Sequence, residues 1–108
     1  MFKKMPLTFD EVLEYDKLYL IYTLSIFSYK THYSYSIAYW NNDVKCTSQV
    51  EANTKYHAIT PGMITMMINL EYISINDVED SMCLDIPRNE GMAITISNCP
   101  NITFVNRD

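Results

Sequence analysis

The side chains with the greatest potential for chemistry are three cysteines and two histidines. A cysteine nucleophile needs a histidine beside it as base and a third group that orients this histidine. His57 with Cys46 is the least implausible pair, but no catalytic signature surrounds either residue. The chain has only two glycines, too few for a turn that builds an oxyanion hole or for a loop that cradles phosphate. The sequence therefore does not predict an enzyme. The residues concerned are Cys46, Cys83, Cys99, His32 and His57.

Metal and redox sites are not indicated either. The three cysteines form no CxxC pair, and no spacing joins them to a histidine in a metal-ligand pattern. We expect free, buried thiols, and neither a metal nor a cofactor. The adjacent carboxylates of Glu79 and Asp80 could serve acid–base chemistry, but in a charged segment such groups are usually solvated.

Tyrosines are concentrated in one stretch, residues 19–40, which holds six of the nine in the chain. In the strand expected there, Tyr33, Tyr35 and Tyr39 share one face. If that face is buried, each hydroxyl needs a partner, since an unsatisfied one costs about 1–3 kcal/mol. If it is exposed, it forms an aromatic patch of the kind that is enriched at protein interfaces. Both placements remain open, and we predict these three tyrosines as anchors for a partner.

The net charge of −5 is also concentrated. Residues 71–90 contain six carboxylates against Arg88 alone, so this segment accounts for the whole imbalance. Such a field attracts a basic partner and disfavours nucleic acid, whose phosphates need basic groups. The alternative is a solvated face that keeps the protein dissolved. The predicted charged contacts are Asp77, Glu79, Asp80 and Asp85.

The first half of the chain predicts a short helix and three strands. Thr8 and Glu11 have the spacing of a capping box, which predicts a helix over residues 9–17. Alternation of period two then predicts strands over residues 18–27, 33–40 and 44–51, with a turn at residues 41–43. In the first strand, one face is expected to carry Leu20, Tyr22, Leu24 and Ile26. Short connections favour an antiparallel meander.

The second half is less regular. Residues 56–59 suggest a short strand, and residues 62–70 fit a helix slightly better than a strand. A second capping-box pattern from Asn76 to Glu79 predicts helical turns over residues 77–83. Strands are expected at residues 92–97 and 102–105, with a turn between them. The fold class is then α+β: an antiparallel sheet of five to six strands with a meander core, a short N-terminal helix and one or two further helices on one face.

These features predict one domain over residues 1–108. No secretory signal is expected at the N-terminus, and the longest apolar stretch, about 12 residues, is shorter than the roughly 20 of a membrane span. We expect a cytoplasmic, non-enzymatic, acidic protein that inhibits a basic protein partner, in particular an immunity protein for a bacterial toxin such as a nuclease. The alternatives are a phage or mobile-element inhibitor of a host defence protein and a homodimeric assembly subunit joined through the tyrosine face.

Overall fold

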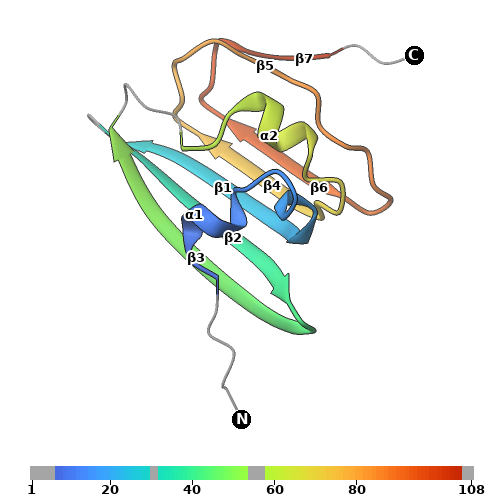
Figure 1. Cartoon of the computed structure of the whole chain (residues 1–108). Helices are drawn as coiled ribbons and strands as arrows, with labels where there is room; N and C mark the ends of the chain where they lie inside the picture. The colour runs from blue at the N-terminus through green and yellow to red at the C-terminus, as the bar shows by residue number, and fades with distance from the viewer. Residues whose placement is uncertain (1–6, 30–31, 54–57, 106–108) are drawn as a thin grey trace.

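The computed structural model describes residues 7–29, 32–53 and 58–105 (Figure 1). Short helices and seven strands make up this part of the chain. The helices are α1 (Phe9–Val12), the 3₁₀ helix η1 (Leu18–Leu20) and α2 (Pro61–Thr65). The strands are β1 (Ile21–Tyr29), β2 (His32–Asn41), β3 (Val44–Asn53), β4 (Tyr72–Asn76), β5 (Met82–Leu84), β6 (Ala93–Ser97) and β7 (Ile102–Phe104).

The main sheet has five strands in the order β3-β2-β1-β4-β6. The predicted meander is confirmed, because β1, β2 and β3 are antiparallel neighbours. The prediction of a wholly antiparallel sheet is wrong, because β4 pairs parallel to β1 and β6 pairs parallel to β4. Parallel neighbours need crossover connections, and these run through α2 and β5. β5 and β7 form a separate parallel pair.

A β-bulge changes the phase of β1. Ile21 lies opposite Tyr39 while Thr23 lies opposite Ala38, so Tyr22 is an extra residue in this strand. The buried residue before the bulge, Ile21, therefore has an odd number, whereas the buried residues after it, Leu24 and Ile26, have even numbers. The predicted single face from residue 20 to residue 26 is wrong at its N-terminal end, because strict alternation does not anticipate an inserted residue.

The hairpin between β2 and β3 is confirmed. Asn42 and Asp43 have φ of 49° and 66°, so both turn residues are in the left-handed region. This is the geometry of a two-residue type I′ turn, whose twist matches that of the flanking strands. The predicted alternation in β3 is confirmed from Cys46 onward: Cys46, Ser48 and Val50 are half-buried, and the residues between them are exposed. It is wrong at Val44, which the alternation places on the same face but which is 59% exposed beside the turn.

The helices are shorter than predicted. The Thr8–Glu11 capping box is present, but α1 ends at Val12 and the chain continues in turns that lead to η1. α2 confirms the helix within residues 62–70 but ends at Thr65. The helical turns predicted for residues 77–83 are wrong, because Asp77 has a φ of 60° and donates its backbone N–H to the carbonyl of Ser97. Of the strand predicted at residues 56–59, residues 56–57 lie outside the described residues, and residues 58–59 form a bend.

One face of the main sheet carries the core. α1 and α2 lie on the same side of this sheet, and the β5–β7 pair lies beyond α2 (Figure 1). The buried side chains of these layers form one cluster. The other face carries a row of small hydroxyl side chains across three neighbouring strands, Ser25, Ser36 and Ser74, together with exposed aromatic side chains such as Phe27 and Tyr72. No helix in the described part of the chain combines the length and apolar character needed to cross a membrane.

Candidate functional site

Tyr33, Tyr35 and Tyr39 share one face of β2, as predicted, and that face is the buried one. Their side chains are only 3%, 1% and 1% exposed. They pack within the main core cluster rather than forming a surface patch. The expectation that they anchor a partner depended on exposure, so these three side chains are not available as a contact surface in this structure.

The buried tyrosine hydroxyls have polar partners. The Tyr39 hydroxyl donates to the backbone carbonyl of Leu7 at 2.8 Å, which fastens the chain before α1 to the sheet. Burial raises the pKa of Tyr35, while hydrogen bonds from the backbone at Ala58 and Ile59 lower it in part. No buried side-chain nitrogen or oxygen of the described residues lacks a partner. This satisfaction makes a tyrosine-rich core energetically acceptable.

Tyr33 connects the tyrosine face to the acidic segment. Its hydroxyl donates a hydrogen bond to the carboxylate of Asp80. Burial, followed by this hydrogen bond and the charge of Asp80, raises the pKa of Tyr33. The tyrosine face and the acidic segment, which together predicted a partner surface, thus contact each other within the fold.

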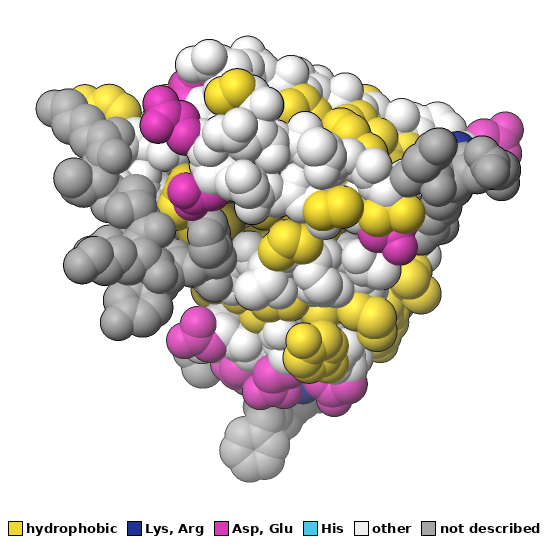
Figure 2. Space-filling model, turned by 90° about the horizontal axis from the view of Figure 1, so that it is seen from above, with side chains coloured by type: hydrophobic (Ala, Val, Ile, Leu, Met, Phe, Trp, Pro, Cys, Tyr) yellow, Lys and Arg dark blue, Asp and Glu magenta, His cyan; other side chains and the backbone are white. Residues whose placement is uncertain are grey.

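Of the remaining predicted acidic residues, Glu79 adjoins Asp80, and its charge also raises the pKa of Tyr33. Asp77 accepts a hydrogen bond from the side-chain amide of Asn98 at 2.8 Å, and Glu79 is exposed. Asp85 lines a separate hollow of about 320 Å³ together with Arg88. Figure 2 shows acidic side chains spread around the outline of one face, with hydrophobic and neutral groups between them.

The structure contains a site that sequence reasoning missed, which we call the aromatic cleft. It is a hollow of about 430 Å³ at the end of the main sheet where the β2–β3 hairpin turns. Its walls come from η1, β1, β2, β3 and the segment before β4. The lining residues are Tyr19, Leu20, Tyr22, Trp40, Lys45, Asn69 and Glu71.

Two aromatic rings and one cation form the centre of the aromatic cleft. The ring centroids of Tyr22 and Trp40 are 5.6 Å apart at an interplanar angle of 40°. The Lys45 ammonium lies 5.2 Å from the Trp40 centroid and 5.7 Å from that of Tyr22. These distances allow cation–π attraction to both rings. The site therefore already holds one positive charge against its aromatic faces.

Local structure explains how these groups meet. The two-residue turn places Lys45 directly opposite Trp40 in the β2–β3 register. Counting back from the turn could have found this pair in the sequence. Tyr22 joins them because it is the bulge residue of β1, and that position has no sequence signal that we recognised.

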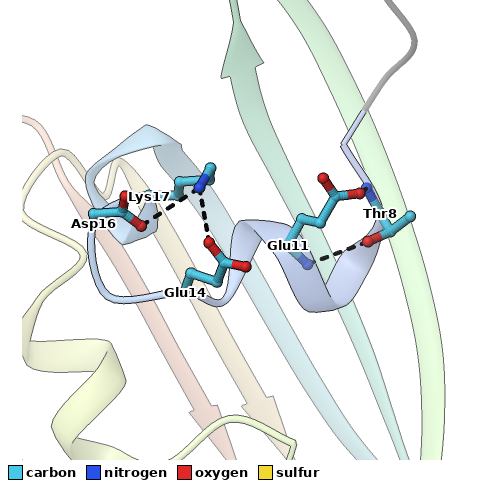
Figure 3. A network of polar contacts seen from close by, with 5 residues as sticks. All are labelled: Thr8, Glu11, Glu14, Asp16 and Lys17. Atoms are coloured by element: carbon cyan, nitrogen blue, oxygen red, sulfur yellow. Dashed lines mark hydrogen bonds and ion pairs between the residues drawn. The ribbon is translucent and has the colours of Figure 1, made fainter.

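A second hollow, of about 380 Å³, adjoins the aromatic cleft and shares Tyr19, Leu20 and Trp40 with it. Asp16 and Lys17 line its other side. The Lys17 ammonium contacts Glu14 at 2.8 Å and Asp16 at 3.5 Å, as Figure 3 shows. These carboxylates raise the pKa of Lys17 and outnumber its single positive charge. This edge of the aromatic cleft is therefore acidic.

The candidates for chemistry occupy structural positions. All three cysteines are free thiols; Cys83 is exposed and the other two are half-buried, so the prediction of buried thiols is wrong. The Cys99 sulfur accepts from the backbone N–H of Val78 and lies 3.2 Å from the carbonyl of Ser97. His57 lies outside the described residues. Within the described ranges, no three His, Cys, Asp or Glu side chains gather so as to hold a metal ion.

The aromatic cleft combines aromatic, cationic and acidic side chains of the described residues. Comparisons of the chain with protein-family models, with curated proteins and with solved structures find no match.

Proposed function

We propose that this protein is a small acidic binding protein that captures a basic protein partner in the aromatic cleft. The observation that carries the proposal is the exposed aromatic surface of Trp40 and Tyr19 beside the carboxylate of Glu71. Lys45 already covers the faces of Trp40 and Tyr22, so an arginine or lysine of a partner would bind at the carboxylates of the cleft and of the adjoining hollow, Glu71 and Asp16. This proposal moves the contact surface from the buried tyrosines to exposed aromatic residues of the same stretch.

The charge of the chain supports a basic partner. It contains thirteen aspartate and glutamate side chains against eight lysine and arginine side chains, a net charge of −5. Lys17 is engaged by two carboxylates, and Lys45 by two aromatic rings. A field of one sign accelerates the approach of a partner of opposite sign, over a range of about 8 Å at physiological salt.

Exposed aromatic area supplies the affinity in this proposal. Trp40 is 40% exposed and Tyr19 is 50% exposed. Tryptophan and tyrosine dominate the energetic centres of protein interfaces, since they bury a large area with few rotatable bonds. The protein would inhibit its partner by covering part of the partner's surface, not by catalysis. An immunity protein acts in this way on a toxin, and a phage protein on a host defence factor.

Capture from a lysate of the native host, at low and at high salt, tests this proposal. Three baits are compared: wild type, Trp40→Ala and Phe27→Ala. Phe27 is a matched control, because it is also 40% exposed but lies outside the aromatic cleft. Circular dichroism verifies that each variant folds. The captured protein is then purified, and its affinity for wild type and for each variant is measured by isothermal titration calorimetry, which does not depend on the tryptophan.

A basic protein that binds wild type and Phe27→Ala, with affinity reduced at least about 30-fold by Trp40→Ala, would support the proposal. Slower association at high salt would support the electrostatic part. Retention of the same protein by all three baits, or of an acidic or neutral protein only, would place the contact elsewhere. A wild-type bait that retains nothing would count against the proposal.

A further inference from the structure

The longest exposed edge of the main sheet belongs to β3. This strand has ten residues, and no described strand pairs with its outer edge. Its register with β2 runs from Val44 to Asn53 without a shift, so no bulge twists the edge away. The strand also has no proline. Proteins commonly protect such edges with bulges, prolines or short strands, because a regular unpaired edge is a template for another strand.

We infer that β3 pairs antiparallel with β3 of a second copy of this chain, about a two-fold axis at Ser48. The resulting dimer joins the two main sheets into one. This inference does not depend on the proposed function. It also differs from a dimer through the tyrosine face, whose side chains are in the core.

The hairpin turn fixes which backbone groups of β3 are free. In a two-residue hairpin the residues that flank the turn, here Asn41 and Val44, form a hydrogen-bonded pair. Hydrogen-bonded and non-hydrogen-bonded pairs then alternate along an antiparallel ladder. Every second residue from Lys45 onward therefore directs its N–H and C=O away from β2. These residues are Lys45, Thr47, Gln49 and Glu51.

The alternation restricts the register of a symmetric pair. Outward-directed groups must face outward-directed groups, so the two-fold axis must pass through a residue rather than between two residues. Near the middle of the strand the choices are Thr47, Ser48 and Gln49. An axis at Ser48 places four outward-directed residues opposite one another and allows about eight backbone hydrogen bonds, two per hydrogen-bonded pair.

Charge selects among these registers. An axis at Ser48 places Lys45 opposite Glu51 of the second copy, twice in the dimer. An axis at Thr47 would instead place Asp43 opposite Glu51, which are like charges. An axis at Gln49 would leave both Lys45 and Glu51 opposite neutral residues. Opposite charges that face each other across strands stabilise a sheet, and like charges destabilise it.

The remaining pairs in the Ser48 register also fit. The half-buried Cys46 of each copy lies opposite the half-buried Val50 of the other copy, so small apolar groups meet on the core side of the sheet. Val44, which is 59% exposed, lies opposite Ala52 and would gain apolar cover. The strand is thus complementary to itself in backbone polarity, charge and apolar character about one residue.

Single-cysteine cross-linking of the full chain tests the register. In a background with Cys46, Cys83 and Cys99 changed to serine, cysteine is placed at residue 47, 48 or 49 by Thr47→Cys, Ser48→Cys or Gln49→Cys. Two copies of residue 48 would face each other as a non-hydrogen-bonded pair, with Cα atoms about 4.5 Å apart, within the range that a disulfide spans. We expect rapid oxidation to a covalent dimer for Ser48→Cys only. Cross-linking through residue 47 or 49 instead would overturn the register.

Oligomeric state in solution tests the dimer itself. Sedimentation of the wild-type protein should give about twice the mass of one 12.6 kDa chain. Glu51→Lys places like charges opposite Lys45 and should weaken the dimer at least about tenfold. The exchange Lys45→Glu with Glu51→Lys restores opposite charges and should restore the dimer. Lys45 also lines the aromatic cleft, so its substitution could affect both the cleft and the dimer. Glu51→Lys and the single-cysteine variants lie outside the cleft and therefore report on the dimer alone. A monomeric wild type, or a double variant no more dimeric than Glu51→Lys, would overturn the inference.

Discussion

The hydroxyl of Tyr33 donates a hydrogen bond to the carboxylate of Asp80, which lies 47 residues further along the chain. Tyr33 starts the tyrosine face of β2, and Asp80 belongs to the acidic segment after β4. A buried tyrosine that is paired with a carboxylate at the surface satisfies its hydroxyl and attaches the loop after β4 to the meander. Residues that suggested an intermolecular contact thus stabilise the fold.

Removal of this hydrogen bond should lower the free energy of unfolding. We expect Tyr33→Phe to cost about 1–2 kcal/mol, because a bond to a charged acceptor is lost while the ring keeps its packing. Asp80→Asn should cost less, since an amide oxygen can still accept. Urea unfolding of both single variants and of the double variant measures the coupling, for which we expect at least about 0.5 kcal/mol. Tyr72→Phe, at an exposed position, is the matched control. Additive effects of the two substitutions would show that the bond contributes nothing.

Alkaline pH should destabilise the protein through its buried tyrosines. Burial raises the pKa of Tyr33, Tyr35 and Tyr39 above the ordinary value of 10.0. A raised pKa means that the folded state holds these protons more tightly than the unfolded state. The contribution to stability is complete below pH 10 and is lost as the pH rises through the folded-state pKa values.

Absorbance of tyrosinate and urea unfolding, both measured from pH 8 to pH 12, check this expectation. Tyr33, Tyr35 and Tyr39 should ionise only as the chain unfolds, because burial raises their pKa in the folded state. Replacement of Tyr35 by phenylalanine should reduce the dependence of the unfolding free energy on pH above 10. If all nine tyrosines ionise in one ordinary step while the fold persists, the tyrosine face is not buried in solution.

A glycine in the turn of the β2–β3 hairpin should raise the free energy of unfolding. Asp43 has a φ of 66°, which costs a side-chain-bearing residue more than glycine. Asn-Gly is the preferred sequence of a type I′ turn, so Asp43→Gly should stabilise the protein by about 0.5–1 kcal/mol. Ser36→Gly, in the middle of β2, is the control and should destabilise by a similar amount. Thermal unfolding of both variants gives the comparison; a loss of stability in Asp43→Gly would contradict the turn geometry.

The three thiols should react at different rates. Cys83 is exposed in β5, whereas Cys99 is half-buried, with its sulfur 3.5 Å from the carbonyl of Ile75 and 3.2 Å from that of Ser97. We expect a disulfide reagent at neutral pH to modify Cys83 first, and all three thiols to react rapidly in denaturant. Cys83→Ser should abolish the fast phase. Should Cys99→Ser abolish it instead, the loop that follows β6 must open readily.

Local features of the fold could be predicted because they depend on neighbouring residues. The capping box of Thr8 and Glu11, the turn at Asn42 and Asp43, and the alternation of β3 each follow from residues at most a few positions apart. The helix predicted at residues 77–83 is absent because a long-range contact overrides the local preference. Its capping pattern is only a local preference, and the bond from Asp77 to Ser97, 20 residues away, favours a left-handed turn there.

The candidate site could be predicted only in part. The enrichment in tyrosine and tryptophan singled out residues 19–40, which contain three aromatic residues of the cleft. The turn register also pairs Trp40 with Lys45. The tyrosines chosen as anchors, however, proved to be core residues, and the exposed aromatic residues of the same stretch line the cleft. Residue type does not distinguish these two groups, because burial is decided by which face of the sheet the helices cover.

The sequence by itself determined the meander, its second turn and the grouping of Tyr33, Tyr35 and Tyr39 on one side of a strand. Period-two alternation and turn chemistry are short-range, so no knowledge of the rest of the chain was needed. Tertiary structure alone decided that the tyrosine face lies inside, that β4 and β6 join the sheet parallel to β1, and that a bulge brings Tyr22 to Trp40. These outcomes depend on contacts between segments tens of residues apart, and on the covering of one sheet face by α1 and α2.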